Sequence, residues 1–144
     1  MRTIQSLLGA SVFFPHEQPS YAMIVDVCCK GEQVDSIVVK PKHWFKREKC
    51  ISFASLKWID GKWTVEGKQF TSDNKPACTV RFLKGKNRLS GQPAYDERGE
   101  TVGLVENVYF LPETGRIVGY EVTEGLYADF LSEKLVVKTL NKSL

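Results

Sequence analysis

The feature that most constrains the fold of this chain is a series of short apolar segments, rich in β-branched and aromatic residues and separated by turn-forming residues. Such side chains favour extended backbone, and the frequent turns leave little room for long helices. The pattern predicts an all-β protein, either a sandwich or a barrel. The expected strands are Ser11–Phe14, Ala22–Cys29, Val34–Lys40, Ile51–Phe53, Leu56–Ile59, Trp63–Glu66, Cys78–Leu83, Pro93–Tyr95, Thr101–Phe110, Arg116–Thr123 and Leu135–Thr139.

Glycines mark the turns between these strands. An Asp-Gly pair that ends at Gly61 lies between two apolar segments, which predicts a tight hairpin. The motifs DERG and PETG, which end at Gly99 and Gly115, suit type I turns followed by a glycine at positive φ. We therefore assign Gly61, Gly99 and Gly115 a structural role in turns. Gly103 and Gly119 lie inside strands and predict bulges or bends.

One segment, Gly125–Lys134, has a helical pattern instead. Its apolar residues Leu126, Tyr127, Phe130 and Leu131 lie on one face at helical spacing. We expect one short helix near the C-terminus.

Size and charge exclude few functions. The 144 residues are enough for one domain or two very small ones, and 42% apolar residues are enough for a core. A net charge of +3 does not demand a nucleic-acid partner. No apolar run approaches the roughly 20 residues that span a bilayer, so we expect no transmembrane segment. The first residues, MRTIQSLLGASVFFPHE, fit a secretory signal poorly.

The cysteines, Cys28, Cys29, Cys50 and Cys78, lack the spacing of a metal site. Adjacent Cys28 and Cys29 would point to opposite faces of a strand, so they do not suit one metal ion. We expect all four to be thiols in a reducing cytoplasm. The sequence thus predicts a cytoplasmic protein without a metal or other cofactor.

Two stretches, Leu7–Lys40 and Leu89–Thr123, share one pattern. Each reads Leu-x-Gly, short strand, polar turn, long apolar strand, Gly turn, apolar strand. Within them IVDVCC matches VENVYF, and VDSIVVK matches IVGYEVT. The pattern predicts a duplicated all-β unit of about 70 residues, joined by a polar stretch near Lys68–Pro76.

The second copy, LSGQPAYDERGETVGLVENVYFLPETGRIVGYEV, resembles a PRC-barrel domain, the small β-barrel of the photosynthetic reaction-centre H subunit and of the ribosome maturation factor RimM. In the first copy, REKCISFASLKWIDGKWTV is similar to the closing pattern of that family. The resemblance implies two tandem small PRC-type β-barrels. We place a first module at 1–67, a linker that offers one candidate strand at 68–85, and a second, shorter module at 86–144.

The second copy has no counterpart to ISFASLKWIDGKWTV, so its barrel lacks a last hairpin and exposes strand edges. The linker segment ACTVRFL could fill this gap, KLVVKTL could close the barrel alone, or a second protomer could cover the edge. We favour a mixture of the first two and keep a homodimer as an alternative.

No catalytic pattern is present in the sequence. The two histidines, His16 and His43, have no Cys, Ser or carboxylate at the spacing of a triad or metal site. Phosphate-binding and hydrolase motifs are missing as well. The carboxylates Asp96, Glu97 and Glu100 cluster in a turn that we expect to be solvated, whereas catalytic carboxylates need shelter from water. We therefore predict a protein that is not an enzyme.

The stretch Lys40–Lys49, KPKHWFKREK, places cations beside aromatic residues. Such a stretch can bind phosphates and bases, an anionic membrane surface, or an acidic protein groove. Alternatively, its aromatic residues cap a barrel end while the lysines stay in water. The candidate partner-binding residues are Lys42, His43, Trp44, Phe45, Lys46 and Arg47.

The function that we predict is a non-enzymatic protein-interaction or assembly module of a prokaryotic cytoplasm. The resemblance implies contacts with proteins: one relative docks to a ribosomal protein, and another organises a membrane complex. Neither specific role carries over, because the companion domain and the membrane anchor of those relatives find no match here. The alternatives are an RNA-associated or ribosome-associated module that uses residues 40–49, and a small-ligand or metal-binding protein.

Overall fold

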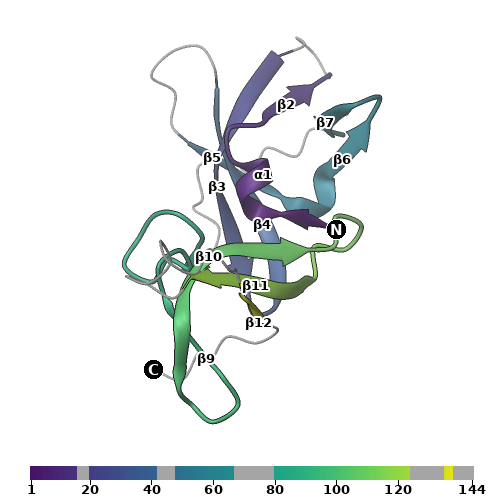
Figure 1. The fold of residues 1–144 in the computed structure, drawn as a ribbon. Coiled ribbons are helices and arrows are strands. Elements are labelled where there is room, and N and C mark those ends of the chain that lie inside the picture. Colours follow the sequence, from purple (N-terminus) through teal and green to yellow (C-terminus); the bar gives the residue numbers. More distant parts are fainter. Residues whose placement is uncertain (16–19, 42–47, 67–79, 124–134, 138–144) are drawn as a thin grey trace.

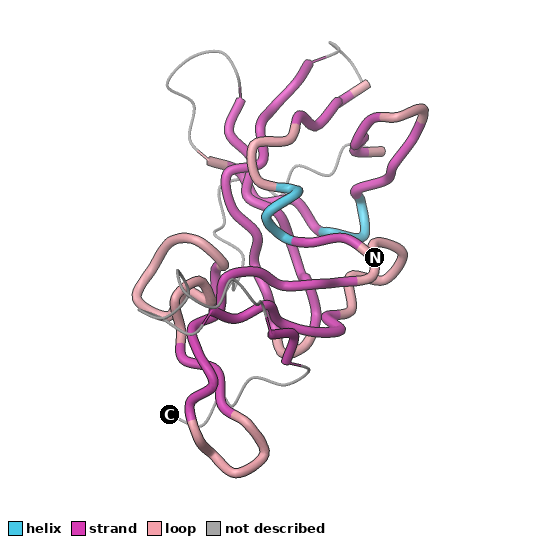
Figure 2. Tube along the Cα trace, in the orientation of Figure 1, coloured by secondary structure: helices cyan, strands magenta, loops and turns pink. Residues whose placement is uncertain are grey.

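Strands dominate the computed structural model of this chain, as Figure 2 shows. The prediction of a mainly β protein is therefore confirmed. The helix predicted over Gly125–Lys134 lies outside the described residues. The structure describes residues 1–15, 20–41, 48–66, 80–123 and 135–137.

The larger of two sheets, called here the large sheet, has the hydrogen-bonded order β5-β4-β3-β2-β7-β6, and β8 pairs with another part of β3. Its pairs are antiparallel except that of β2 with β7. A 3₁₀ turn, Phe53–Ser55, joins β5 to β6. Because these two strands stand at opposite ends of the order, the sheet curls on itself as in a small barrel. The strands are β2 (Ser11–Phe14), β3 (Ser20–Lys30), β4 (Gln33–Pro41), β5 (Lys49–Ser52), β6 (Leu56–Ile59), β7 (Lys62–Val65) and β8 (Val80–Arg81).

The second sheet, called the small sheet, has the order β1-β10-β11-β12, with β9 also paired to β10. Its register shifts between Thr101 and Gly103, which confirms the bulge predicted at Gly103. In Figure 1 the strands β9–β12 lie below the large sheet, and the helical turn α1 (Ile4–Leu7) lies where the two sheets meet. The strands are β1 (Arg2–Thr3), β9 (Pro93–Tyr95), β10 (Thr101–Phe110), β11 (Ile117–Thr123) and β12 (Leu135–Val137).

The first strand of each half of the chain pairs with the other half. β1 pairs with β10, where Arg2 lies opposite Phe110. β8 pairs with β3, where Arg81 lies opposite Cys28. The expectation that the segment ACTVRFL fills a gap in the second barrel is therefore wrong: its strand, β8, belongs to the large sheet. By contrast, β12, within the segment KLVVKTL, pairs with β11 at one end of the small sheet. The expectation that this segment closes a barrel stays a prediction.

Both sheets contain the same hydrogen-bonded turn. In the first Leu-x-Gly motif the N–H of Gly9 donates to the carbonyl of Ile24 at 2.8 Å. In the second, the N–H of Gly91 donates to the carbonyl of Val105, also at 2.8 Å. These are the residues that the sequence comparison aligned, so the local pattern produces the same local geometry twice.

Two further hydrogen bonds, one just after β8 and one just after β1, correspond to each other in the two halves of the chain. The N–H of Leu83, just after β8, donates to Asp26 Oδ1 at 2.8 Å. The N–H of Gln5, just after β1, donates to Asn107 Oδ1 at 3.1 Å. Asp26 and Asn107 occupy equivalent positions of β3 and β10, each next to a register shift. The two halves of the chain thus exchange their first strands in the same way.

The Asp26 carboxylate accepts hydrogen bonds from several donors. The side chain of Asp26 is fully buried and accepts from the N–H of Val27 at 2.8 Å and of Lys84 at 3.0 Å, besides that of Leu83. The Nε of Arg81 donates at 2.7 Å to Oδ2, the oxygen that also accepts from Lys84. A buried carboxylate with this many partners serves the structure, since removing one partner would leave the charge uncompensated. The contacts fix β8 and the residues after it on β3.

The two sheets are also joined directly through their central turns. The N–H of Val34 donates to the carbonyl of Gly115 at 2.7 Å, and the N–H of Ile117 donates to that of Glu32 at 2.8 Å. Between them Gln33 and Arg116 form an isolated antiparallel bridge. These reciprocal bonds connect the β3–β4 turn to the β10–β11 turn.

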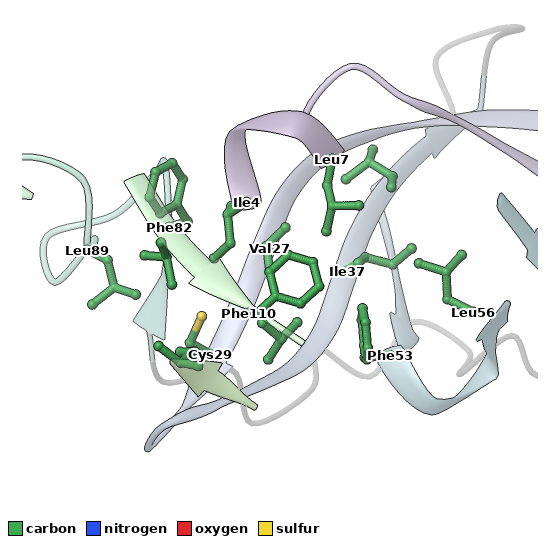
Figure 3. Close-up of a cluster of buried hydrophobic side chains, with 14 of the residues drawn as sticks. Ile4, Leu7, Val27, Cys29, Ile37, Phe53, Leu56, Phe82, Leu89 and Phe110 are labelled. Atoms are coloured by element: carbon green, nitrogen blue, oxygen red, sulfur yellow. The ribbon is translucent and has the colours of Figure 1, made fainter. Parts of the chain in front are cut away.

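One hydrophobic cluster contains buried side chains from both sheets. Figure 3 shows Ile4 and Leu7 of α1 above this cluster, with Phe53 of the large-sheet half and Phe110 of β10 within it. The rings of Phe53 and Phe110 meet edge to face, with centroids 5.7 Å apart. The two sheets come from different parts of the sequence but share one hydrophobic core.

The cysteine prediction needs one correction. Cys28 is disulfide-bonded, whereas it was expected to be a thiol. Cys29 and Cys50 are free thiols, as expected. The sequence misled because the usual spacing patterns of disulfide-rich domains are missing, while the bond depends on proximity in the fold.

Candidate functional site

The ends of the predicted binding stretch Lys40–Lys49 belong to β4 and β5. Residues 42–47, which include all six candidate partner-binding residues, lie outside the described residues, and their role stays a prediction. The three turn glycines are described: φ is 74° at Gly61, 78° at Gly99 and 79° at Gly115. Gly115 lies at the junction of the two sheets.

A different group of aromatic and basic side chains comes together beside the N-terminus. We call this group the aromatic–cation face. It is built from β1, β2, β3 and the β6–β7 hairpin, so it depends on strands from both ends of the first half of the chain. Its members are Arg2, Phe13, Tyr21, Trp58, Lys62 and Trp63.

The tryptophans form the centre of this face. Trp58 and Trp63 lie directly opposite each other in the β6–β7 hairpin, and their rings meet at 73° with centroids 5.0 Å apart. The guanidinium of Arg2 lies 4.6 Å from the Trp58 ring centroid and 4.9 Å from that of Trp63. A cation at this distance from two indole rings is attracted by both. Trp63 is buried, whereas Trp58 remains 51% exposed.

The second part of the face lies beside the tryptophans. Phe13 and Tyr21 are opposite each other on β2 and β3, with ring centroids 5.0 Å apart. The Nζ of Lys62 lies 5.5 Å from the Phe13 ring centroid and donates to the hydroxyl of Tyr21 at 3.5 Å. Tyr21 is 41% exposed. Two aromatic pairs, each with its own cation, therefore lie side by side.

Two pockets adjoin the aromatic–cation face, and Arg2, Trp58 and Trp63 line both of them. The larger pocket, of ≈ 600 Å³, extends toward the sheet junction, where Phe53 and Pro112 line it. The smaller pocket, of ≈ 350 Å³, lies between the tryptophans and the Phe13–Tyr21 pair. Together they form a continuous concave surface with the tryptophans at its centre.

The two pockets differ in charge. The larger pocket is lined by the carboxylates Asp35 and Glu113 as well as by the cations Arg2 and Lys57. Among the described residues, the smaller pocket is lined by the cations Arg2 and Lys62 and by no carboxylate. The concave surface thus has a mixed end and a cationic end.

Other titratable groups of the described residues do not form a catalytic arrangement. Burial raises the pKa of the Cys50 thiol, which keeps it protonated and weakly nucleophilic. Burial also raises the pKa of Tyr120 to about 12. Glu121 is buried and accepts a hydrogen bond from the hydroxyl of Tyr109 at 2.6 Å, as a satisfied buried carboxylate does.

Metal-binding clusters and membrane-spanning helices are both absent from the described residues. Among the described residues no group of three or more His, Cys, Asp or Glu side chains is arranged to hold a metal ion. None of the described helices has the length and apolar character needed to cross a bilayer.

Reasoning from the sequence missed the aromatic–cation face. One signal was available: in LKWIDGKWTV a two-residue turn places the two tryptophans opposite each other. No sequence pattern indicated that Arg2 belongs to this face, because only the pairing of β1 with β10 brings Arg2 to the β6–β7 hairpin.

Comparison with known proteins agrees with the fold. Residues 84–139 match the family model described as PRC-barrel domain, a range that contains β9, β10, β11 and β12. The chain is also similar to the Uncharacterized protein YrrD of Bacillus subtilis (strain 168), with 24% identity over 139 residues that cover 93% of this chain and 76% of that protein. A barrel-like β-sheet with these turns was expected from the resemblance. Residues 84–139 of this chain are a PRC-barrel domain.

Proposed function

We propose that this chain is a non-enzymatic protein-interaction or assembly module of the PRC-barrel type, and that it binds its partner through the aromatic–cation face. The observation that carries the proposal is Trp58, a large side chain that is 51% exposed yet held against Trp63 and Arg2.

The composition and rigidity of this surface support binding. Tryptophan, tyrosine and arginine are the residues that most often dominate the energetics of protein interfaces. Here their side chains are ordered before any partner arrives, since ring contacts and cation–π contacts hold Arg2, Trp58 and Lys62. Binding therefore loses little side-chain entropy, which favours affinity.

The wider organisation is part of the same proposal. The stretches 1–67 and 86–144 are two PRC-barrel-like modules, joined by residues 68–85. Strand β1 of the first module pairs with β10 of the second, and strand β8 of the joining residues pairs with β3 of the first. The matching bonds of Gly9 and Gly91, and of Leu83 and Gln5, support this view. Residues Lys42–Arg47 provide a second binding stretch, and the module acts in a prokaryotic cytoplasm.

The test is an affinity pull-down of the tagged chain from lysate of its own organism, with and without nuclease, followed by mass spectrometry. We expect the wild type to retain a small set of proteins in both conditions. The variant Trp58→Ala should lose them. The matched control is Leu104→Ala, because Leu104 is 40% exposed on β10 and lines neither pocket.

Other outcomes would decide against the proposal. Retained proteins that survive Trp58→Ala as well as Leu104→Ala would show that the partner binds elsewhere. Proteins that disappear on nuclease treatment, and that also depend on Lys46 and Arg47, would favour the RNA-associated alternative, whose binding weakens steeply with salt.

A further inference from the structure

The smaller pocket of the aromatic–cation face is lined by two positively charged side chains, which favour a negatively charged ligand. We propose that it binds an acidic segment of a partner protein, with a carboxylate between Arg2 and Lys62 and a neighbouring apolar side chain on the rings. This inference rests on the proposed function and adds the chemical class of the partner. Its evidence is the lining of the pocket, which combines two cations with four aromatic rings.

Both cations are available to a ligand. In the described part of the chain the side-chain ion pairs link Arg81 to Asp26 and Glu48, and Lys84 to Glu48. Arg2 and Lys62 take no part in them and contact aromatic rings instead. A ring attracts a cation without neutralising it, so the charge of each residue still acts on the pocket.

The rings around the cations strengthen this effect. Trp58, Trp63 and Phe13 exclude part of the water around Arg2 and Lys62, and two charges interact more strongly where water is excluded. A guanidinium fixed by stacking also presents its N–H groups in one orientation, which suits a carboxylate. An acidic side chain in this pocket would therefore replace lost hydration with directed hydrogen bonds.

The shape of the site favours a peptide over a nucleic acid. The smaller pocket, of ≈ 350 Å³, has room for one or two side chains, and the larger pocket continues from the shared tryptophans with apolar walls at Phe53 and Leu56. An extended peptide fits this plan, with an acidic residue at the cationic end and an apolar residue at the other. A nucleic acid needs a longer row of cations, whereas the larger pocket carries Asp35 and Glu113.

The experiment uses random linear peptides displayed on phage and selected against the immobilised full-length chain. Selected sequences are then synthesised with a fluorophore and titrated by anisotropy against the wild type, Lys62→Gln and Lys86→Gln. Each substitution removes one positive charge from an exposed side chain, but Lys86 lines neither pocket. Lys62→Gln leaves the buried core unchanged, so both variants should fold, which circular dichroism checks.

We expect selected peptides to carry Asp or Glu next to an apolar residue. Lys62→Gln should weaken their binding about tenfold, as the loss of one charge-assisted hydrogen bond does, while Lys86→Gln should match the wild type. Selection of peptides without acidic residues, failure to select any peptide, or equal effects of the two variants would each overturn the inference. Displacement of the peptide by a single-stranded oligonucleotide at lower concentration would overturn it in favour of nucleic acid.

The two proposals can fail separately. If the cellular partner is lost with Trp58→Ala but retained with Lys62→Gln, the face is the binding surface and the acidic ligand is wrong. If no cellular protein depends on Trp58, the proposed function fails at its first step.

Discussion

At the scale of single residues, Gly115 shows how one position can serve both local and long-range structure. Its φ of 79° is a conformation that side-chain-bearing residues rarely adopt. A Cβ at this position would also lie 2.8 Å from Gln33 Nε2, 2.9 Å from the Val34 carbonyl oxygen and 3.0 Å from Phe53 Cδ2. The turn motif explains the first requirement, and only the contact between the sheets explains the second.

We therefore expect Gly115→Ala to be far more harmful than Gly99→Ala. Gly99 has nearly the same φ, 78°, but a Cβ there would meet nothing within 4 Å. Gly99→Ala should cost about 1 kcal/mol of unfolding free energy, from backbone strain alone. Gly115→Ala should cost about 3 kcal/mol, because the sheet junction must also shift. Urea denaturation measures both, and equal losses would contradict a close approach at this turn.

At the scale of elements, the N-terminal segment belongs structurally to a domain far along the chain. β1 pairs with β10, and α1 contributes the fully buried Ile4 and Leu7 to the common core. The Thr3 hydroxyl caps α1 by accepting from the N–H of Ser6 at 3.2 Å. A two-residue strand and a four-residue helical turn have too little internal stability to form alone, so tertiary contacts must hold them.

Leu7→Ala should accordingly destabilise the PRC-barrel domain at residues 84–139, although it lies outside that range. We expect a loss of about 3 kcal/mol in unfolding free energy, since the substitution leaves a cavity in the core. Gln5→Ala is the control, because its side chain is exposed while its backbone N–H still donates to Asn107. Hydrogen exchange should speed up at amides of β10 in the leucine variant alone. Unchanged exchange there would show that β10 does not depend on the N-terminal segment.

At the scale of the whole molecule, the two sheets are coupled by exchanged strands, reciprocal turn bonds and one core. β8 is tied to β3 through Asp26, and the Gln33–Arg116 bridge connects the central turns. Loss of either sheet would expose the inner face of the other, including Phe53 and Phe110. The contacts between the sheets therefore contribute to the stability of both sheets.

This coupling predicts a single unfolding transition rather than two. Tryptophan fluorescence of a Trp44→Phe variant, which keeps Trp58 and Trp63, follows the aromatic–cation face of the large sheet. Hydrogen exchange in denaturant follows the amides of β10 and β11 in the small sheet. Both should give one midpoint and one free energy of unfolding. Two separate transitions would mean that the modules are independent and that the shared core adds little stability.

The positions of most strands and turns could be predicted from local sequence alone. Ser11–Phe14, Leu56–Ile59, Pro93–Tyr95 and Thr101–Phe110 have the predicted bounds, because apolar segments and turn residues act over a few neighbouring positions. The same short-range pattern of apolar segments and turn residues led to the resemblance to a PRC-barrel domain, whose family model matches residues 84–139.

Which strands pair across the two halves, and hence where the candidate site lies, depends on tertiary contacts. β1 is two residues long and lies outside every predicted strand, whereas β8 lies within the predicted strand Cys78–Leu83. For both, the partner strand is chosen by long-range contacts such as that of Asp26 with Arg81. Arg2 reaches the tryptophan hairpin for the same reason. Strand order and the convergence of distant side chains depend on long-range packing, which local residue preferences do not encode.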